Sequence, residues 1–325
     1  MQKFSQTVKD EVVREELGTA RECIKAELAA LLHMTGSIHL TGQQQLSLNL
    51  MIETAGVARR VVKLLKASYN LESEVRVEQF ERLGKPHRYN LIIPAQKGLR
   101  EMLAELGMLT REHQIESGIK PELVKDNPCR AAFLRGAFLG GGSITDPQKK
   151  TYHLELVTHS EDFANGLAYL MNLLGLKAKI SQRKEHFLVY LKEGEALAKF
   201  LSLISANNAV LKLEEVRVIK ELRGQVNRRV NCETANLQKT LDAAWEQVEM
   251  ITALKNGGKL ANLPANLRET AELRLEYPEA SLKELGEYHK PPLSKSTVNH
   301  RLRMIRECTK KFYVTAGIHS GKEKK

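Results

Sequence analysis

The chain has 325 residues, which leaves room for two or three domains with ordinary hydrophobic cores. Hydrophobic residues make up 42% of it and charged residues 27%, proportions typical of a soluble globular protein. No apolar run approaches the roughly 20 residues that cross a bilayer, and residues 1–17 lack the apolar segment of a signal peptide. We therefore expect a cytoplasmic protein without a membrane partner.

Positive charge is concentrated near the end of the chain. The net charge is +11, and residues 281–325 alone hold 11 Lys and Arg against 4 Asp and Glu. A concentrated basic segment suits a polyanion, because neutralising phosphates releases condensed counterions. The alternative for the last residues, 313–325, is a solubilising basic tail.

Four cysteines stand far apart in the sequence. None forms a C-x-x-C pair, and no histidine lies at zinc-finger spacing from a cysteine pair. We expect four reduced thiols, with no metal, cofactor or disulfide framework; they are Cys23, Cys129, Cys232 and Cys308.

One pattern occurs twice, 106 residues apart. The segment 23–38, which starts at Cys23 and ends in Gly-Ser-Ile, returns as 129–144 with Ala, Leu, Gly, Ser and Ile at matching positions. Thr54 and Ser160 are related by the same offset. Each copy predicts a helix that runs into a Gly-Ser turn and a strand. Two such copies would share one core through their helices about a pseudo-two-fold axis, and Gly136 would permit close helix–helix approach.

The rest of each repeat follows the same order of elements. In the first, 21–110, periodicity predicts a strand at 46–50, a helix at 56–67, strands at 75–80 and 89–93, and a helix at 99–109. In the second, 128–206, it predicts a strand at 151–158, a helix at 160–174, strands at 178–182 and 186–191, and a helix at 195–204.

The C-terminal part is predicted to be helical throughout. A charged helical connector covers 207–260, and three helices follow in 261–312, at 266–277, 282–289 and 295–308. Ser281 and Glu284 form an S-x-x-E capping box at the second helix, and Pro291 and Pro292 mark the turn before the third. A short helix, a tight turn and a second helix are typical of a helix-turn-helix domain.

The third helix has two distinct faces. Val298, Leu302 and Ile305 share an apolar face, and polar side chains cover the remainder. We expect base contacts from Ser296, Asn299, His300 and Arg303, because Arg and Asn can read G and A by bidentate hydrogen bonds. Contacts to the DNA backbone are expected from Lys295, Arg301, Arg306, Lys310 and Lys311.

Residues 134–142 (LRGAFLGGG) resemble the central helix of LAGLIDADG homing endonucleases. In that family the residue before the last Gly is an acid that binds the catalytic metal. The corresponding positions here are Thr35 and Gly141, which offer no carboxylate. The resemblance thus implies the endonuclease scaffold without its chemistry, and we expect no enzyme activity and no small-molecule substrate.

Two further stretches, 223–240 (RGQVNRRVNCETANLQKT) and 293–302 (LSKSTVNHRL), resemble the WhiA family of bacterial sporulation and cell-division regulators. The resemblance implies an α+β protein: a pseudo-two-fold LAGLIDADG-like domain of two αββαββα-like repeats, preceded by a segment 1–20 and followed by an all-α helix-turn-helix domain. It also implies links to sporulation, cell division and chromosome segregation.

The expected function is sequence-specific binding of double-stranded DNA to regulate transcription, in the cytoplasm and at the nucleoid. A protein co-regulator and a homodimer are left open as further partners. The alternative is a nucleoid-associated scaffold that binds DNA without sequence preference and recruits proteins. The ratio of specific to non-specific affinity separates the two.

Overall fold

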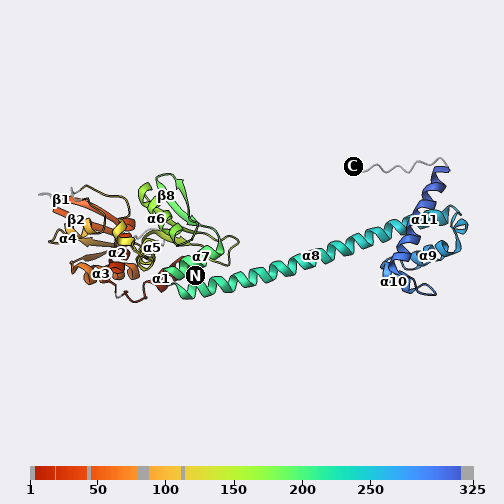
Figure 1. Ribbon diagram of the computed structural model, residues 1–325, viewed down its shortest axis with the longest axis horizontal. Coiled ribbons are helices and arrows are strands. Elements are labelled where there is room, and N and C mark those ends of the chain that lie inside the picture. The colour runs from red at the N-terminus through yellow and green to blue at the C-terminus, as the bar shows by residue number, and fades with distance from the viewer. Residues whose placement is uncertain (1–3, 19, 42–44, 79–87, 111–113, 316–325) are drawn as a thin grey trace. The chain divides into compact units, whose positions relative to one another are not determined.

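The computed structural model describes residues 4–315 except 19, 42–44, 79–87 and 111–113. The chain divides into two compact units, residues 1–221 and 222–325, here called the N-terminal and C-terminal units (Figure 1). The expected division into repeats, connector and helix-turn-helix is finer than this, and its boundaries stay predictions.

The N-terminal unit contains the two expected αββαββα repeats. A short helix, α1 (Phe4–Val12), precedes them. The first repeat consists of α2 (Arg21–Thr35), β1 (Gly36–Thr41), β2 (Gln45–Ile52), α3 (Ala55–Tyr69), β3 (Glu74–Glu78), β4 (Arg88–Ile93) and α4 (Leu99–Glu105). A 3₁₀ turn, η2 (Pro121–Val124), leads to the second, which consists of α5 (Asn127–Gly141), β5 (Gly142–Ile144), β6 (Leu154–Thr158), α6 (Glu161–Leu173), β7 (Lys179–Arg183), β8 (His186–Leu191) and α7 (Gly194–Leu203). The α+β class is confirmed.

The two sheets repeat each other in strand order and register. Both are antiparallel, with orders β1-β2-β4-β3 and β5-β6-β8-β7. Ile38 pairs with Leu48 in the first, and Ile144 pairs with Leu154 in the second, at the 106-residue offset. Equivalent caps also begin equivalent helices: Thr54 accepts a hydrogen bond from Val57 N in α3, and Ser160 accepts one from Phe163 N in α6.

Several element ends differ from the sequence-based expectation, and strand β6, for example, begins at Leu154 rather than 151. Helix α4 ends at Glu105 rather than 109, because Gly107 adopts a left-handed φ of 74° and the Met108 amide bonds back to the Leu103 carbonyl. Strand β3 ends at Glu78, and the expected position of Phe80 lies outside the described residues.

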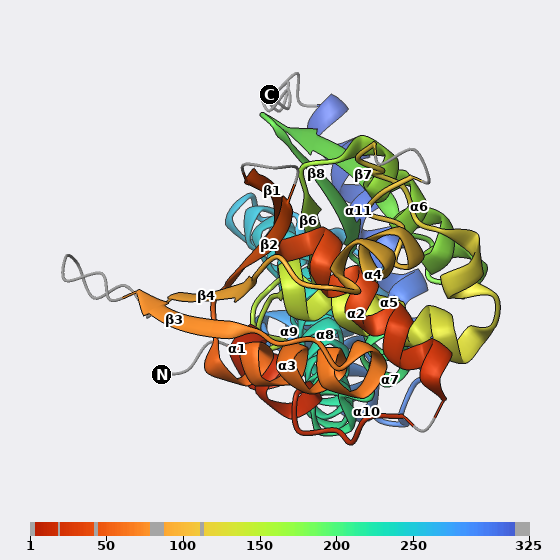
Figure 2. The ribbon, with the colours of Figure 1, turned by 90° about the vertical axis from the view of Figure 1, so that its left-hand side faces the viewer.

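Helices α2 and α5 form the centre of the N-terminal unit, and Figure 2 shows them next to one another there. Residues 26–32 of α2 are buried, as are nearly all of residues 132–139 of α5. A side chain at Gly136 would overlap the Glu27 carbonyl and would stand 3.0 Å from Ala30 Cβ. The close approach expected of Gly136 is therefore confirmed, and it brings the two repeats into one core.

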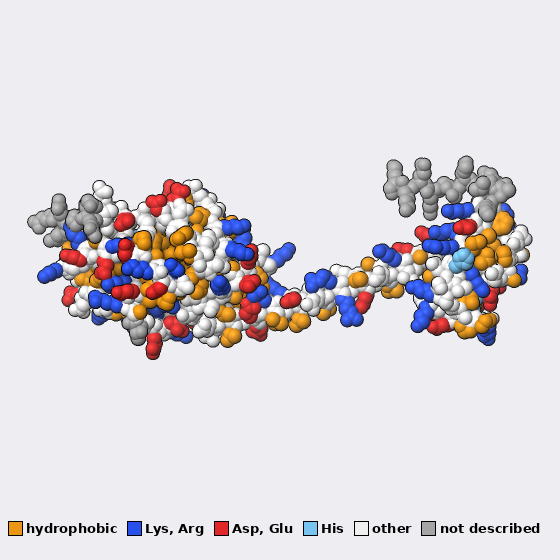
Figure 3. All heavy atoms as spheres, in the orientation of Figure 1, with side chains coloured by type: hydrophobic (Ala, Val, Ile, Leu, Met, Phe, Trp, Pro, Cys, Tyr) orange, Lys and Arg blue, Asp and Glu red, His pale blue; other side chains and the backbone are white. Residues whose placement is uncertain are grey.

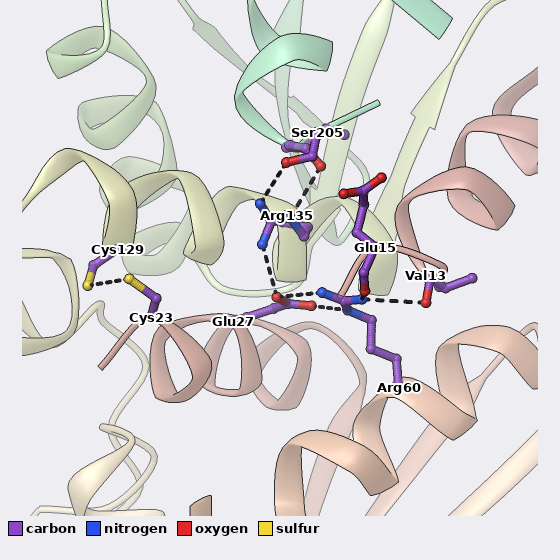
Figure 4. A network of polar contacts seen from close by, with 9 residues as sticks. Val13, Glu15, Cys23, Glu27, Arg60, Cys129, Arg135 and Ser205 are labelled. Carbon is purple, nitrogen blue, oxygen red and sulfur yellow. Dashed lines mark hydrogen bonds and ion pairs between the residues drawn. The ribbon is translucent and has the colours of Figure 1, made fainter. Parts of the chain in front are cut away.

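A buried ion network joins these helices to their surroundings (Figure 4). Both Glu27 and Arg60 are almost fully buried, and the Arg60 guanidinium donates to both Glu27 carboxylate oxygens. From the second repeat, Arg135 donates to Glu27 Oε2 at 3.3 Å, to the Ile204 carbonyl and to the Ser205 hydroxyl. One carboxylate thus pairs with two arginines from different repeats.

The long helix α8 (Asn207–Asn256) contributes to both units. Its first turns bury Ala209 and Leu213 in the N-terminal unit. In the C-terminal unit a 3₁₀ turn, η3 (Leu260–Asn262), leads to α9 (Ala265–Glu276), α10 (Leu282–Glu287) and α11 (Lys295–Thr315). These are the three expected helices. The third continues past the expected end at 308 because Phe312 still packs on the core.

Candidate nucleic-acid interface

The turn between α10 and α11 is fixed by caps and by one glycine. The capping box is complete: Ser281 N donates to Glu284 Oε2 at 2.8 Å, and Glu284 N donates to Ser281 Oγ at 3.3 Å. Gly286 lies so close to the Leu293 carbonyl that a Cβ would overlap it, while the Leu293 amide donates to the Gly286 carbonyl at 2.9 Å. The tight helix–turn–helix geometry therefore requires glycine at 286.

The apolar face of helix α11 packs against the other helices of the C-terminal unit. Ser294 caps the helix by accepting a hydrogen bond from Thr297 N at 3.2 Å. The expected triad of Val298, Leu302 and Ile305 is buried. It packs with residues from α8, α9 and α10: Ile251, Leu254, Leu267, Ala271 and Leu285. This packing turns the opposite face of α11 to solvent.

Buried polar residues, which the sequence analysis missed, hold the helices in register. The Arg274 guanidinium is buried and donates to the Ala280 carbonyl at 2.6 Å. His289 is also buried; its Nδ1 donates to the Leu285 carbonyl at 2.9 Å, and its Nε2 shares a hydrogen bond with Thr270 Oγ1 at 2.9 Å. Nothing in the local sequence indicated that the side chains of Arg274 and His289 have a structural role.

The four residues expected to contact bases lie on the exposed face of α11. All of Ser296, Asn299, His300 and Arg303 are exposed. Ser296 Oγ shares a hydrogen bond with Ser294 Oγ at 2.8 Å. Among the described residues, Asn299, His300 and Arg303 have no hydrogen-bond or ion-pair partner, so their donors and acceptors are available to a ligand.

The residues expected to contact the DNA backbone are placed differently from one another. Lys295 and Lys310 are exposed. Arg306 is exposed but forms an ion pair with Glu246 of α8 at 2.8 Å. Arg301 is half-buried and donates to the Asn266 carbonyl at 3.1 Å and Thr270 Oγ1 at 3.2 Å, with Glu269 at 3.5 Å. The side chain of Lys311 lies outside the described residues.

The two positions equivalent to metal-binding acids lie at the C-terminal ends of the central helices. Thr35 is the last residue of α2, and its hydroxyl donates to the Leu31 carbonyl at 2.7 Å. Gly141 ends α5, and a Cβ there would overlap Met34. Nearby Glu155 is engaged by Ser143 and His153 at 3.1 and 3.0 Å. Neither position supplies a carboxylate for a metal ion.

A second polar cluster lies at the opposite ends of the same helices. Cys23 Sγ and Cys129 Sγ are 3.1 Å apart, and Asp126 caps α5 by accepting from Cys129 N at 2.8 Å. Burial raises the pKa of the Cys129 thiol, and its bonds to Cys23 and Asp126 raise it further. Within the described part of the chain, these three residues form a cluster of possible metal ligands, whose ligand atoms all lie within 4.8 Å of one another. The contact was not foreseen, although Cys23 and Cys129 were expected in equivalent helices.

Three family models match successive parts of the chain. They describe a WhiA N-terminal LAGLIDADG-like domain at residues 21–109, a WhiA LAGLIDADG-like domain at 130–223 and a WhiA C-terminal HTH domain at 226–309. The chain belongs to the WhiA family. The resemblance drawn from 223–240 and 293–302 is thereby confirmed.

Individual WhiA proteins are similar to this chain over nearly its full length. The "Probable cell division protein WhiA" of Heliobacterium modesticaldum is 47% identical over 315 residues, which cover 97% of this chain and 98% of that protein. The protein of the same name in Alkaliphilus metalliredigens is 46% identical over 305 residues, covering 93% and 96%. The crystal structure of full-length WhiA from Thermotoga maritima is similar with a TM-score of 0.59 at 25% identity, covering 95% of this chain and 99% of that one.

Membership of the WhiA family, with its helix-turn-helix and its homing-endonuclease-like fold, implies DNA binding. In the described part of this WhiA chain, no helix combines the length and apolar character that a membrane span requires.

Proposed function

We propose that this WhiA protein binds specific sequences of double-stranded DNA and regulates transcription of genes linked to cell division, chromosome segregation and sporulation. The observation that carries the proposal is the exposed face of α11, where Asn299, His300 and Arg303 project without internal partners. Asn and Arg are the side chains that read adenine and guanine edges in the major groove. The protein would act at the nucleoid.

The helix has the length and support that reading a groove requires. Residues 295–306 span about 17 Å at 1.5 Å per residue, and the buried triad fixes which face meets the DNA. Lys295 and Lys310 flank that face and are available for phosphates. Arg301 is paired with Glu269, and Arg306 is paired with Glu246. To contact a phosphate, each arginine would have to leave its acid or bind both groups at once.

The N-terminal unit has a non-catalytic role in this proposal. Cleavage on a LAGLIDADG scaffold needs an acid from each central helix, and Thr35 and Gly141 are not acids. We infer that the unit acts as a rigid platform for DNA or for a protein co-regulator, because a fold can keep its structure after losing its chemistry. Magnesium-dependent cutting of duplex DNA by the purified protein would contradict this.

The proposal is tested by the ratio of specific to non-specific affinity at fixed salt. A selected high-affinity duplex should bind at least about 10³-fold more tightly than random duplexes of equal length. The double variant Asn299→Ala/Arg303→Ala should reduce this ratio towards one while the protein keeps its helical circular dichroism. Equal affinities for all duplexes with the wild-type protein would instead favour a nucleoid scaffold.

A further inference from the structure

The middle of α8 carries an exposed polar face that the helix-turn-helix does not explain. Six side chains lie within an arc of about 140° around the helix axis, at about 100° per residue, with Arg228 at one edge of the arc. All six are exposed: Arg223, Asn227, Arg228, Asn231, Thr234 and Gln238. They form what we call the α8 polar face. It spans about 22 Å at 1.5 Å per residue.

The charge on residues 223–239 is mostly positive. Between Arg223 and Lys239 the only acid is Glu233, on the other side of the helix, where it accepts a hydrogen bond from Arg229 at 3.0 Å. Among the described residues, Arg223, Asn227, Arg228 and Asn231 have no hydrogen-bond or ion-pair partner. Lys and Arg side chains project from the middle of α8 in Figure 3. Cations and amides free of acids suit a polyanion that also presents hydrogen-bonding base edges.

Arg228, at one edge of the α8 polar face, projects from the side of α8 that contacts the recognition helix. Arg228 and Glu246 are 18 residues apart, which is five turns of a 3.6-residue helix, so they project in the same direction. Glu246 contacts Arg306 of α11 at 2.8 Å. Both helical segments belong to the C-terminal unit. A duplex lying along the exposed face of α11 would therefore lie on the side of α8 that carries Arg228.

We infer that the α8 polar face is a second DNA-contacting surface, which binds the duplex beside the base pairs that α11 reads. The choice of DNA as the partner of this face rests on the proposed function. A helix fits the major groove, about 12 Å wide, and Arg side chains can bind phosphates from its rim. The surface lengthens the bound DNA beyond the few base pairs of one recognition helix. A protein partner on this face is the competing occupant.

Neighbouring residues of α8 supply matched controls. Arg228→Ala and Arg229→Ala remove the same charge from adjacent positions, one on the polar face and one paired with Glu233. Asn231→Ala and Asn236→Ala form a second pair, since Asn236 lies off the face and contacts Cys232 Sγ. All four positions are exposed, and unchanged circular dichroism verifies folding.

The experiment measures fluorescence anisotropy of the full chain with random-sequence duplexes of 12 and 40 base pairs across a salt series. Arg228→Ala is expected to weaken binding to the longer duplex about 5- to 10-fold and to lower the slope of log affinity against log salt by about one. Arg229→Ala should change binding less than twofold, and on the short duplex both variants should match the wild type. Asn231→Ala should weaken binding more than Asn236→Ala.

Equal effects of Arg228→Ala and Arg229→Ala, or no effect of Arg228→Ala on the longer duplex, would overturn the inference. Because the duplexes have random sequence, this test does not depend on the sequence preference that the proposed function requires. Loss of sequence preference in Asn299→Ala/Arg303→Ala, with no effect of Arg228→Ala, would sustain the proposed function and reject the α8 surface. Absence of any sequence preference in the wild type would reject the proposed function, and the arginine pair would still decide the α8 surface.

Discussion

Gly136 of α5 lies directly against the backbone of Glu27 on α2, leaving no room for a Cβ. The 106-residue offset relates Gly136 to Ala30, whose Cβ faces it across the helix crossing. One repeat thus contributes a small side chain and the other contributes none. This asymmetry lets the two central helices touch and places Arg135 beside the Glu27 carboxylate.

Gly136→Ala is expected to destabilise the N-terminal unit by about 1–3 kcal/mol, because the added methyl group must push two packed helices apart. Thermal unfolding followed by circular dichroism measures the loss. The matched control is Gly118→Ala, where a Cβ meets nothing within 4 Å. Equal stability of the two variants would show that the helix crossing is looser than the structure indicates.

His33 should make the stability of the N-terminal unit depend on pH. Its ring stacks on Phe163 with centroids 4.9 Å apart, and burial lowers the pKa of His33 from 6.5 to about 4. Between these values the unfolded chain binds a proton that the folded chain does not, so stability falls as pH falls from 6.5 towards 4. The total loss is at most about 3 kcal/mol, at 1.36 kcal/mol per pKa unit.

Denaturant unfolding at several pH values measures this slope. His33→Phe keeps an aromatic ring against Phe163 and should remove most of the pH dependence in that window. His300→Phe, exposed on α11, should leave it unchanged. If His33→Phe and the wild type lose stability in parallel, other groups cause the acid sensitivity.

Cys23 and Cys129 should form a disulfide under a mild oxidant, although both thiols are free here. Diamide accepts the two electrons and two protons that the thiols lose, and the sulfurs are already 3.1 Å apart. Peptide mapping without reductant should find this cross-link in a Cys232→Ser background, which removes the exposed thiol. Adding Cys23→Ser should abolish it. Persistence of both thiols after oxidation would contradict the side-chain geometry.

The sequence was sufficient wherever the determinants are local. The Cys-to-Ile repeat, the caps at Thr54 and Ser160 and the Ser281 capping box each depend on residues close in sequence, and their elements were predicted with small errors at the ends. The apolar triad of α11 likewise identified its buried face, since a helix buries one stripe.

Contacts between segments that are distant in the chain could not be predicted from the sequence. Arg301 lies beside the reading residues on a helical wheel, yet α9 packs against that side and engages it through Asn266 and Thr270. The Glu27–Arg60 pair joins residues 33 apart, and the two cysteines are 106 apart. Composition and spacing do not specify which charged or sulfur-bearing side chains meet in the packed core.

Arg303→Ala should weaken binding to the cognate site by about 1–3 kcal/mol and relax sequence preference at one position, because a bidentate contact to guanine is lost. Arg301→Ala should chiefly lower the unfolding temperature of the C-terminal unit, since Arg301 ties α11 to α9. Binding selections with each variant, beside thermal unfolding, measure both effects. An unchanged preference in Arg303→Ala would remove Arg303 from the reading set.

The most direct test of sequence-specific regulation is genome-wide immunoprecipitation of the protein with its DNA, comparing the wild type with Asn299→Ala/Arg303→Ala at equal protein levels. Sharp peaks at promoters are expected for the wild type, and these peaks should be lost in the double variant. Broad signal that is the same in both would contradict sequence reading by α11 and would assign the protein to non-specific association with the nucleoid.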